Sequence, residues 1–285
     1  MKYAYVEITE RCNLKCPFCP SATLEQRSEM PVDFFKNVLN RLKGNVSEIF
    51  LHVLGEPLLH PHFPEILRAI QPADFQLNLT TNGTLISKYE NEILGSRSLR
   101  QVNFSTHAYA YMPNEKAEQL LAQTIAFAKR LQKERPEVYL NFRLWNDSAD
   151  VLSDNWNSSV FKILSGEFEK ELSPAKFSVR HKSIPIAGRI YLHRDSRFEW
   201  PEGNGDIREC GTCHGTIDQC AVLSDGRVVP CCLDYRGNIP LGKFPEESFE
   251  TVLCGERAKR IREGFLSRKL VEPFCQRGPF SKRFR

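Results

Sequence analysis

Alternating strand-like and helix-like segments up to about residue 180 restrict how this chain can fold more than any other feature. Short apolar runs such as residues 4–8 and 138–144 alternate with amphipathic segments, and residues 114–133 form the clearest helix. Asn114 is placed to cap this helix, and Pro136 lies beyond its end. About six such units predict an α/β fold with a parallel sheet. Because six units are too few for a closed eight-stranded barrel, we expect a partial (β/α)6 TIM-like barrel with ligands at the carboxyl ends of its strands.

The expected elements follow from hydrophobic periodicity and from glycine and proline punctuation. Strands are expected at residues 4–8, 46–54, 75–79, 102–104, 138–144 and 177–179. Helices are expected at residues 31–42, 62–70, 85–94, 114–133 and 156–168.

The C-terminal third of the chain has a different character. Residues 181–209 contain several prolines and glycines with little periodicity, which predicts a linker. From Cys210 onward the chain is rich in cysteine, glycine and arginine, and Asp225-Gly226 between two apolar runs predicts a β-hairpin. A helix is expected at residues 249–266. We therefore predict a core barrel at residues 1–200 and a small cysteine-rich domain of hairpin and helix at residues 201–285.

Composition narrows the class of protein. The 285 residues are 41% apolar and 26% charged, which is enough for a packed core and excludes a disordered chain. No apolar run reaches the roughly 18 residues that a membrane helix requires, so no membrane association is expected. A net charge of +4 does not indicate a nucleic-acid-binding protein. The N-terminus shows no signal peptide, and we expect a cytoplasmic protein.

Ten cysteines fall into two groups that are separated by 190 residues without any. In a reducing compartment, clustered cysteines more often bind metal or take part in chemistry than form disulfides. The first group is Cys12, Cys16 and Cys19, and the second is Cys210, Cys213, Cys220, Cys231, Cys232, Cys254 and Cys275.

The first group has the spacing Cys-x3-Cys-x2-Cys and directly follows the first expected strand. Three thiolates on one short loop can hold three irons of a [4Fe–4S] cluster and leave the fourth iron open for another ligand. A zinc site would instead require a fourth protein ligand. His52, His60 or His107 could supply that ligand.

These segments in combination resemble the radical S-adenosylmethionine (radical SAM) enzymes over about residues 4–145. The cysteine spacing, with Phe18 before the last cysteine, resembles the signature of that family. Gly55-Glu56-Pro57 at the end of the second strand is similar to its Gly-Gly-Glu-Pro motif, except that Leu54 stands in place of the first glycine. Thr80-Thr81-Asn82-Gly83 and Phe104-Ser105 end the next two strands, as in many members.

The resemblance implies a function for each of these positions. Cys12, Cys16 and Cys19 would hold the [4Fe–4S] cluster, and S-adenosylmethionine would bind its open iron. Residues near this cofactor would be Phe18 at the adenine, Gly55 and Glu56 at the methionine amino group, Asn82 at the end of the third strand, and Ser105 and Arg143 at the ribose or carboxylate. Purely structural roles remain open for Glu56 as a turn cap, for Asn82 in a turn and for Arg143 in an ion pair.

The second cysteine group resembles the twitch and SPASM extensions of radical SAM enzymes, which bind an auxiliary [4Fe–4S] cluster. The resemblance implies Cys213, Cys231 and Cys275 as ligands, with Gly278 where a fourth cysteine is expected. Three alternatives are open: an open iron that binds substrate, a fourth thiolate from one of the other cysteines, or loss of the cluster. The candidate donors are Cys210, Cys220, Cys232 and Cys254. A zinc ribbon is a further alternative, and Cys220 fits a simple core position.

The resemblance implies an oxidoreductase or maturase that reductively cleaves S-adenosylmethionine and abstracts hydrogen from a peptide or a small natural product. The outcome could be oxidation, epimerisation or crosslinking. A non-catalytic iron–sulfur or zinc protein and an RNA-modifying radical enzyme are the alternatives. The basic residues 256–285 predict either a solvated surface or a docking surface for an acidic flavodoxin or ferredoxin electron donor. No residue stands out as a catalytic acid or base.

Overall fold

The computed structural model describes residues 1–24, 28–147, 149–178, 180–197, 199–201 and 207–278. Two compact units divide the chain: the first contains residues 1–77 and 198–285, and the second contains residues 78–197. The N-terminal segment and the cysteine-rich C-terminal segment therefore belong to the same unit.

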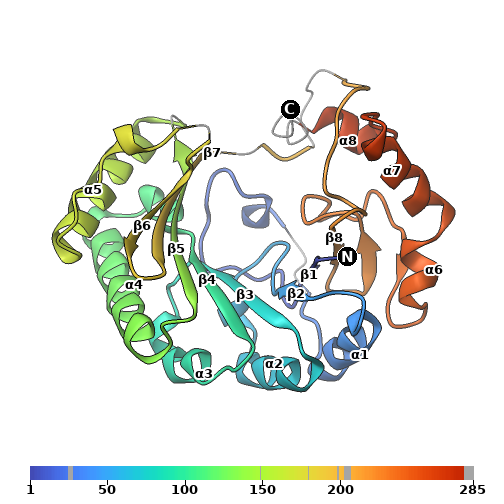
Figure 1. Ribbon diagram of the computed structural model, residues 1–285, viewed down its shortest axis with the longest axis horizontal. Coiled ribbons are helices and arrows are strands. Elements are labelled where there is room, and N and C mark those ends of the chain that lie inside the picture. The colour runs from blue at the N-terminus through green and yellow to red at the C-terminus, as the bar shows by residue number, and fades with distance from the viewer. Residues whose placement is uncertain (25–27, 148, 179, 198, 202–206, 279–285) are drawn as a thin grey trace. The chain divides into compact units, whose positions relative to one another are not determined.

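The first unit is built around β1, which lies between two parallel neighbours. Ala4 of β1 pairs with Ile49 of β2 on one side and with Cys220 of β8 on the other. The strand order is β10-β9-β8-β1-β2. The strands are β1 Tyr3–Val6, β2 Glu48–Phe50, β8 Gln219–Val222, β9 Arg227–Val229 and β10 Gly242–Lys243. The helices are α1 Val32–Leu42, α2 Phe63–Ile70, α6 Phe249–Leu253, α7 Glu256–Leu266 and α8 Pro273–Arg277, with 3-10 turns at Pro20–Ala22, Pro57–Leu59 and Gln71–Ala73. Figure 1 shows α1 and α2 beside the blue strands and α6 and α7 beside the orange ones.

The predicted hairpin in the cysteine-rich segment is confirmed. β8 and β9 are antiparallel, and Gly226 in the turn between them has a φ of +89°. Asp225 Oδ1 accepts a hydrogen bond of 3.0 Å from the backbone N–H of Arg227. The predicted helix over residues 249–266 is interrupted, because α6 ends at Leu253 and a new helix, α7, begins after Gly255.

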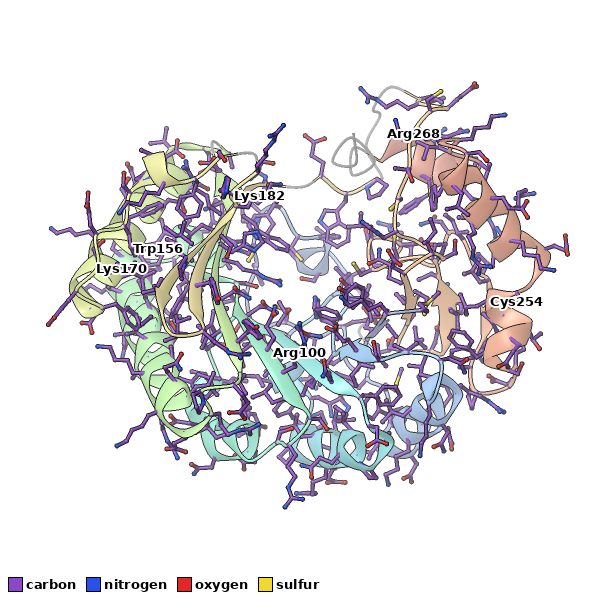
Figure 2. All side chains as sticks on the ribbon, viewed as in Figure 1. Arg100, Trp156, Lys170, Lys182, Cys254 and Arg268 are labelled. Atoms are coloured by element: carbon purple, nitrogen blue, oxygen red, sulfur yellow. The ribbon has the colours of Figure 1, made fainter. Side chains whose placement is uncertain are left out.

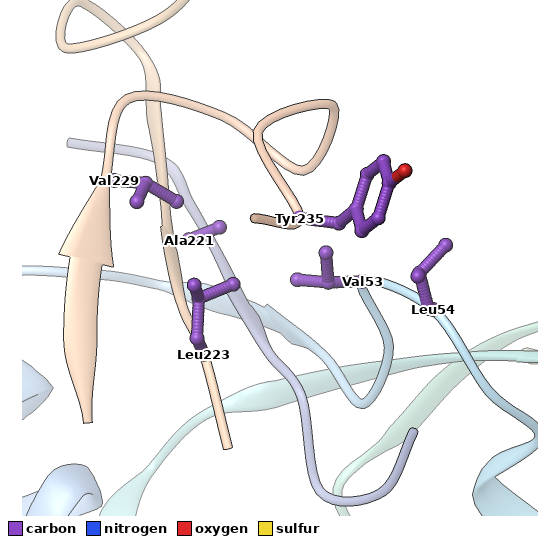
Figure 3. Close-up of a cluster of buried hydrophobic side chains, with 6 residues drawn as sticks. All are labelled: Val53, Leu54, Ala221, Leu223, Val229 and Tyr235. Atoms are coloured by element: carbon purple, nitrogen blue, oxygen red, sulfur yellow. The ribbon is translucent and has the colours of Figure 1, made fainter. Parts of the chain in front are cut away.

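A cluster of buried apolar side chains joins the loop after β2 to the hairpin (Figure 3). Tyr5 and Trp200 pack against this cluster. The cluster consists of Val53, Leu54, Ala221, Leu223, Val229 and Tyr235. Burying apolar side chains from segments far apart in the sequence stabilises the first unit as one packed body.

The second unit is a sheet with helices on one side. Its strand order is β3-β4-β5-β7-β6, and β3 begins in the first unit. The strands are β3 Gln76–Thr81, β4 Leu99–Phe104, β5 Tyr139–Asp147, β6 Ser183–Ala187 and β7 Ile190–Ser196. The helices are α3 Glu90–Leu94, α4 Asn114–Glu134 and α5 Val151–Glu167, with 3-10 turns at Ile86–Lys88, Thr106–Tyr111 and Pro174–Lys176. β5 runs parallel to β4 and β7, whereas β6 is antiparallel to β7.

The two faces of β5 differ in character because successive side chains of a strand point to opposite sides. One set, exemplified by Phe142, is buried with Phe104 of β4 at a ring distance of 5.8 Å. Phe127 of α4 packs against Phe104, and Figure 1 shows α4 and α5 on this side of the strands. Trp156 of α5 points toward the sheet in Figure 2 and donates a hydrogen bond of 2.8 Å to the carbonyl oxygen of Thr106. The other face is polar.

Two sequence predictions in this region are wrong. About half of the predicted linker at 181–209 is the β6–β7 hairpin, with Gly188 in a left-handed turn between the strands. Pro185 suggested a linker, but it lies on the edge strand β6, where the ladder tolerates a residue without an N–H. The predicted strand at 177–179 is also wrong: Phe177 and Ser178 lie outside any strand, and residue 179 lies outside the described residues. β7 takes the next position in the parallel sheet instead.

Two smaller predictions concern helix ends and membrane association. Asn114 does not cap α4, because the helix already includes it and Pro113 occupies the cap position without a side-chain hydrogen bond. Proline has φ fixed near the helical value, which allows it to begin the helix.

Across the described residues, we find no helix that combines the length and apolarity needed to cross a bilayer.

Candidate active site

The loop that follows β1 carries the first three cysteines, here called the cluster loop, residues 12–19. Cys12, Cys16 and Cys19 are all half-buried, and none of the three is joined in a disulfide. A turn closes between Cys19 N–H and Cys16 O at 3.0 Å, and the 3-10 turn Pro20–Ala22 follows at once. Leu14 N–H lies 3.5 Å from Cys12 Sγ. The three thiols therefore share one short, hydrogen-bonded loop, as their spacing predicted.

The electrostatics of the cluster loop suit a cationic iron site. Burial, followed by the neighbouring charges of Cys19 and Cys12, raises the pKa of the Cys16 thiol to about 12. Three thiolates in such a place repel one another unless a cation neutralises them. The donor set therefore fits a [4Fe–4S] cluster with one iron left open.

The three histidines considered as a fourth zinc ligand have other contacts in the structure. Both ring nitrogens of His60 are engaged, with Nε2 at 2.9 Å from Met30 O and Nδ1 at 3.2 Å from His62 N. His52 packs edge-on against Tyr5 at a ring distance of 5.6 Å. His107 belongs to the second unit, where its Nδ1 lies 3.1 Å from Arg143 O. The sequence could not reveal these local partners.

The Gly55–Glu56 loop is fastened to the backbone immediately before the cluster loop. Gly55 has a φ of +75°, and a Cβ at this position would overlap the carbonyl oxygen of Thr9. Glu56 N–H donates to Arg11 O at 2.8 Å, and the Glu56 carboxylate accepts 3.1 Å from Leu58 N–H. Only glycine permits this close approach. Glu56 caps the turn that follows, while its backbone ties the loop to the segment leading into Cys12.

Sequence reasoning missed Glu7. This carboxylate is only 1% exposed and accepts a hydrogen bond of 3.0 Å from the N–H of Leu54, next to Gly55. The available signal was a glutamate inside the apolar strand sequence of residues 4–8, where a polar side chain must find partners when it is buried.

Phe18, which was predicted near the adenine, accepts a hydrogen bond of 3.1 Å at its carbonyl oxygen from Trp200 Nε1.

The other three predicted cofactor residues lie in the second unit. Asn82 follows β3, and its Oδ1 accepts from Thr84 N–H at 3.0 Å, so it does form a turn. Ser105 follows β4, and its N–H donates to Thr81 O at 2.9 Å. Arg143 lies on the polar face of β5. Asn82 and Ser105 directly follow β3 and β4, at the carboxyl ends of strands where ligands of such sheets bind, whereas Arg143 lies within β5.

A cluster of polar aromatic and cationic groups surrounds Arg143. Its guanidinium lies 4.4 Å from the ring centre of Trp145, and that ring contacts His107 and His193 at ring distances of 6.5 and 5.7 Å. Burial, together with the charge of Arg143, lowers the pKa of both histidines to about 4, so both are neutral at pH 7. Trp145 Nε1 is buried and has no hydrogen-bond partner among the described residues. The cluster thus offers one fixed cation and several neutral hydrogen-bonding groups.

The auxiliary cysteines Cys213, Cys231 and Cys275 come from three separate segments of the first unit and lie close enough to interact. Burial raises the pKa of Cys231 well above its ordinary value, and the charges of Cys213, Cys232 and Cys275 raise it further. Cys213 and Cys275 pack against one apolar cluster formed by Ile239, Ile261, Phe265 and Leu270. These three thiols interact electrostatically with one another, and three thiolates are the kind of donor that an iron–sulfur cluster requires.

The remaining C-terminal cysteines differ sharply in their surroundings. Cys210 and Cys254 are exposed, and Figure 2 shows Cys254 at the outer side of α6. Cys220 is fully buried in β8 with apolar neighbours, which agrees with a core position. Cys232 is half-buried; burial raises its pKa to about 12, followed by the charge of Cys213, while a hydrogen bond from Tyr5 lowers it. Of the four candidate donors, Cys232 alone interacts electrostatically with both Cys213 and Cys231.

Two family profiles match the chain at these sites. The radical SAM superfamily matches residues 6–132, and an iron–sulfur cluster-binding domain named SPASM matches residues 213–277. A protein of Pyrococcus furiosus named "Tungsten-containing aldehyde ferredoxin oxidoreductase cofactor-modifying protein" is 32% identical over 96% of this chain and 86% of its own length. The chain belongs to the radical SAM superfamily. A GTP 3′,8-cyclase of Synechocystis sp. is also 32% identical to this radical SAM protein, but over only 35% of the chain.

Solved structures of radical SAM enzymes share the fold. SuiB of Streptococcus suis gives a TM-score of 0.59 at 15% identity, covering 92% of this chain and 67% of its own. BtrN with AdoMet and 2-DOIA gives 0.52 at 15% identity, covering 92% of this chain and 86% of its own. The anSMEcpe enzyme with bound AdoMet gives 0.57 at 14% identity, covering 91% and 79%.

These findings confirm several predictions made from sequence. The fold class is α/β, with a mostly parallel sheet of the partial-barrel type and a cysteine-rich C-terminal region. The protein is a SPASM-type radical SAM enzyme, and its two matched domains imply a [4Fe–4S] cluster, S-adenosylmethionine and auxiliary cluster binding. The predicted domain boundary near residue 200 and the individual ligand residues remain predictions.

Proposed function

We propose that this radical SAM enzyme cleaves S-adenosylmethionine reductively and abstracts hydrogen from a small, anionic, cofactor-type molecule. The observation that carries the proposal is the joining of the cluster loop to the Gly55–Glu56 loop by the Glu56 N–H···Arg11 O bond. A three-thiolate site with an open iron and a loop for the methionine group thereby occupy adjacent backbone. When bound, the cluster and S-adenosylmethionine supply a 5′-deoxyadenosyl radical that removes the hydrogen atom.

The residues of this chain bind and orient the cofactor. Cys12, Cys16 and Cys19 hold three irons, and the backbone of the Gly55–Glu56 loop receives the methionine amino group. For the cofactor we propose Phe18 of the first unit at the adenine and Asn82 and Ser105 of the second unit at the ribose and carboxylate. Arg143, also predicted at the ribose or carboxylate, is instead proposed as the cation for the substrate. None of these residues transfers a proton; their function is to orient the reacting carbon and to exclude water.

The cluster around Arg143 supports an anionic substrate of small size. Arg143 supplies a permanent positive charge, while neutral His107 and His193 and the buried N–H of Trp145 supply hydrogen-bonding groups. The Pyrococcus relative is named for modifying a cofactor, which favours a small molecule over a peptide. Substrate-dependent formation of 5′-deoxyadenosine with peptides, and not with anionic small molecules, would overturn this choice.

For the auxiliary site we propose Cys213, Cys231, Cys275 and Cys232 as the four ligands. Cys232 is adjacent to Cys231, interacts electrostatically with Cys213, and receives a hydrogen bond from the Tyr5 hydroxyl. A Cys232→Ser variant should lose auxiliary iron and change the Mössbauer spectrum of that cluster. Cys254→Ser is the matched control, since Cys254 is exposed, and it should retain all iron. Full iron and an unchanged spectrum in Cys232→Ser would favour an open iron for substrate.

The electron donor and the location follow from the same chemistry. We propose a flavodoxin or ferredoxin as donor and the cytoplasm as the compartment, because the cluster requires a low-potential reductant. Part of the basic C-terminal segment is structural: Arg257 and Arg260 pair with buried Glu272 at 2.8 and 2.9 Å. The exposed side chain of Arg268 remains available for an acidic partner.

The test is anaerobic reconstitution followed by iron and sulfide analysis and by measurement of 5′-deoxyadenosine. Wild type should hold about eight irons and the Cys12/Cys16/Cys19→Ala variant about four, with 5′-deoxyadenosine formed by wild type alone. About four irons falling to none would mean that the C-terminal cysteines hold no cluster. Wild-type protein that neither binds nor cleaves S-adenosylmethionine would overturn the proposed function and favour a non-catalytic metal protein.

A further inference from the structure

Glu7 is a buried carboxylate that touches two functional segments of the first unit at once. Its Oε1 accepts a hydrogen bond of 3.0 Å from Leu54 N–H, and its Oε2 accepts one of 3.3 Å from Ser224 N–H. Leu54 precedes Gly55 in the proposed S-adenosylmethionine loop, and Ser224 begins the turn of the auxiliary hairpin β8–β9. The Glu7 side chain therefore contacts both the proposed S-adenosylmethionine loop and the auxiliary hairpin.

A second carboxylate extends this network toward the cluster loop. The hydroxyl oxygens of Ser224 and Ser28 lie 2.5 Å apart. Ser28 donates to Glu10 Oε2 from its N–H at 2.7 Å and from its hydroxyl at 2.6 Å. Glu10 lies two positions before the first cluster cysteine. The Glu7 network, defined as Glu7, Glu10, Ser28, Leu54 and Ser224, thus connects the ends of the cluster loop, the Gly55–Glu56 loop and the auxiliary hairpin.

The N–H of Leu54 has its hydrogen-bond acceptor in the Glu7 side chain. The neighbouring positions are held by backbone alone, through the close contact of Gly55 with Thr9 and the bond from Glu56 N–H to Arg11 O. Leu54 itself belongs to the buried apolar cluster of Figure 3, where a backbone N–H without an acceptor would be costly. A carboxylate oxygen accepts from it, whereas an amide nitrogen placed there would not.

We propose that Glu7 is a positioning residue that sets the Leu54–Glu56 loop for S-adenosylmethionine and couples that loop to the auxiliary hairpin through Ser224. The proposal rests on the proposed function, because it assumes that this loop receives the cofactor. It assigns Glu7 no contact with the cofactor. Perturbing the hairpin at Ser224 should therefore change cofactor binding even though Ser224 lies in the auxiliary segment.

The experiment uses the reconstituted full chain as wild type, Glu7→Gln, Ser224→Ala and Glu48→Gln. Glu48 is the matched control, since it is also a buried carboxylate, 5% exposed, but lies on β2 and contacts Lys2 at 3.8 Å. The readouts are the dissociation constant of S-adenosylmethionine and the change that it produces in the electron paramagnetic resonance spectrum of the reduced protein. Glu7→Gln should weaken binding about tenfold and Ser224→Ala about threefold, with iron content and the Glu48→Gln values at wild-type levels.

The outcomes separate the positioning role from mere stabilisation. Wild-type affinity and an unchanged spectral response in Glu7→Gln, with a lower melting temperature, would overturn the proposal. If Glu7→Gln does not fold, Ser224→Ala carries the test, and a wild-type dissociation constant there overturns it. A wild-type protein without measurable affinity for S-adenosylmethionine would contradict the proposed function itself, which is a different result.

Discussion

The two cysteine groups of this chain are built in opposite ways. Cys12, Cys16 and Cys19 share one loop of eight residues, whose geometry is set by local hydrogen bonds after β1. Cys213, Cys231 and Cys275 come from three segments that only packing brings together, against the apolar cluster that includes Ile261 and Phe265. A local ligand set can be recognised from spacing, while a dispersed one depends on the fold of the segments that carry it.

This contrast has an energetic consequence. Iron binding at the cluster loop orders a few residues, so it needs little support from the rest of the unit. Iron binding at the auxiliary site must hold three distant segments together, so cluster loss there should be coupled to unfolding of the C-terminal segment. The following predictions test this difference, beginning with the largest effect.

Removing one ligand from each group should separate activity from stability. Cys16→Ala should reduce 5′-deoxyadenosine formation at least about a hundredfold, because the cofactor's iron site is lost. Cys275→Ala should lose auxiliary iron and lower the melting temperature while retaining cleavage of S-adenosylmethionine. The measurements are product formation and thermal unfolding under anaerobic conditions. Equal loss of cleavage in both variants would show that the two groups do not act independently.

Glycines with left-handed backbone provide a second comparison. Gly55→Ala would overlap Thr9 O and Gly226→Ala would overlap Phe244 O, and each should lower the free energy of unfolding by about 2–4 kcal/mol. Gly44 also has a positive φ but no atom near an added Cβ, so Gly44→Ala should cost about 1 kcal/mol. Urea titrations measure the differences. Gly55→Ala should also weaken S-adenosylmethionine binding strongly, while Gly226→Ala, whose turn carries Ser224, should weaken it less. An equal loss of affinity in both variants would show that the two regions do not differ in this respect.

Glu7 should give a measurable pH dependence of stability. Burial raises its pKa from 4.5 to about 7, so the folded protein binds a proton that the unfolded chain releases between these values. The favourable contribution of protonated Glu7 is complete below pH 4.5 and is lost as pH rises through 7. Relative to Glu7→Gln, wild type should therefore lose about 3 kcal/mol of unfolding free energy between pH 4.5 and pH 8. A constant difference across this range would mean that the carboxylate is ionised throughout.

Glu272 should give the smallest effect and the opposite pH dependence. Hydrogen bonds from Arg257, and then from Arg260, hold the pKa of this carboxyl below its usual range. Its contribution is present at neutral pH and is lost as acid protonates it. Glu272→Gln should lower the unfolding free energy at pH 7 by about 1 kcal/mol, with Glu256→Gln, an exposed partner of Lys259, as an unchanged control. Loss of auxiliary iron in Glu272→Gln alone would connect this pair to the auxiliary site.

The sequence predicted those parts of the fold that local patterns determine. Alternating strands and helices gave the parallel sheet, and Asp225-Gly226 gave the hairpin, because each signal lies within a few residues. The β6–β7 hairpin was missed because Pro185 and Gly188 are typical of linkers. Only the sheet order shows that β6 is an edge strand, where proline is tolerated.

The candidate site also has parts that follow from local sequence and parts that depend on long-range contacts. The thiols of the cluster loop and the tight turn at Gly55 follow from spacing and residue type. Glu7 could be noted as a polar residue in an apolar strand, but its partners Leu54 and Ser224 are 47 and 217 positions away. The interaction of Cys232 with Cys213 likewise depends on packing of the hairpin. Long-range contacts of this kind carry no signature in a single sequence.

The position of β1 has a consequence for how the chain could be divided. β1 leads directly into the cluster loop, and both of its edges are paired, one with β2 and the other with β8 near residue 220. A chain that stopped at residue 200 would present the free N–H and C=O groups of β1 as an open strand edge, which is a template for aggregation. During synthesis, more than 200 further residues must be made before β8, the second neighbour of β1, exists. The auxiliary segment therefore cannot be removed as an independent module, and its loss in evolution would have required a substitute strand.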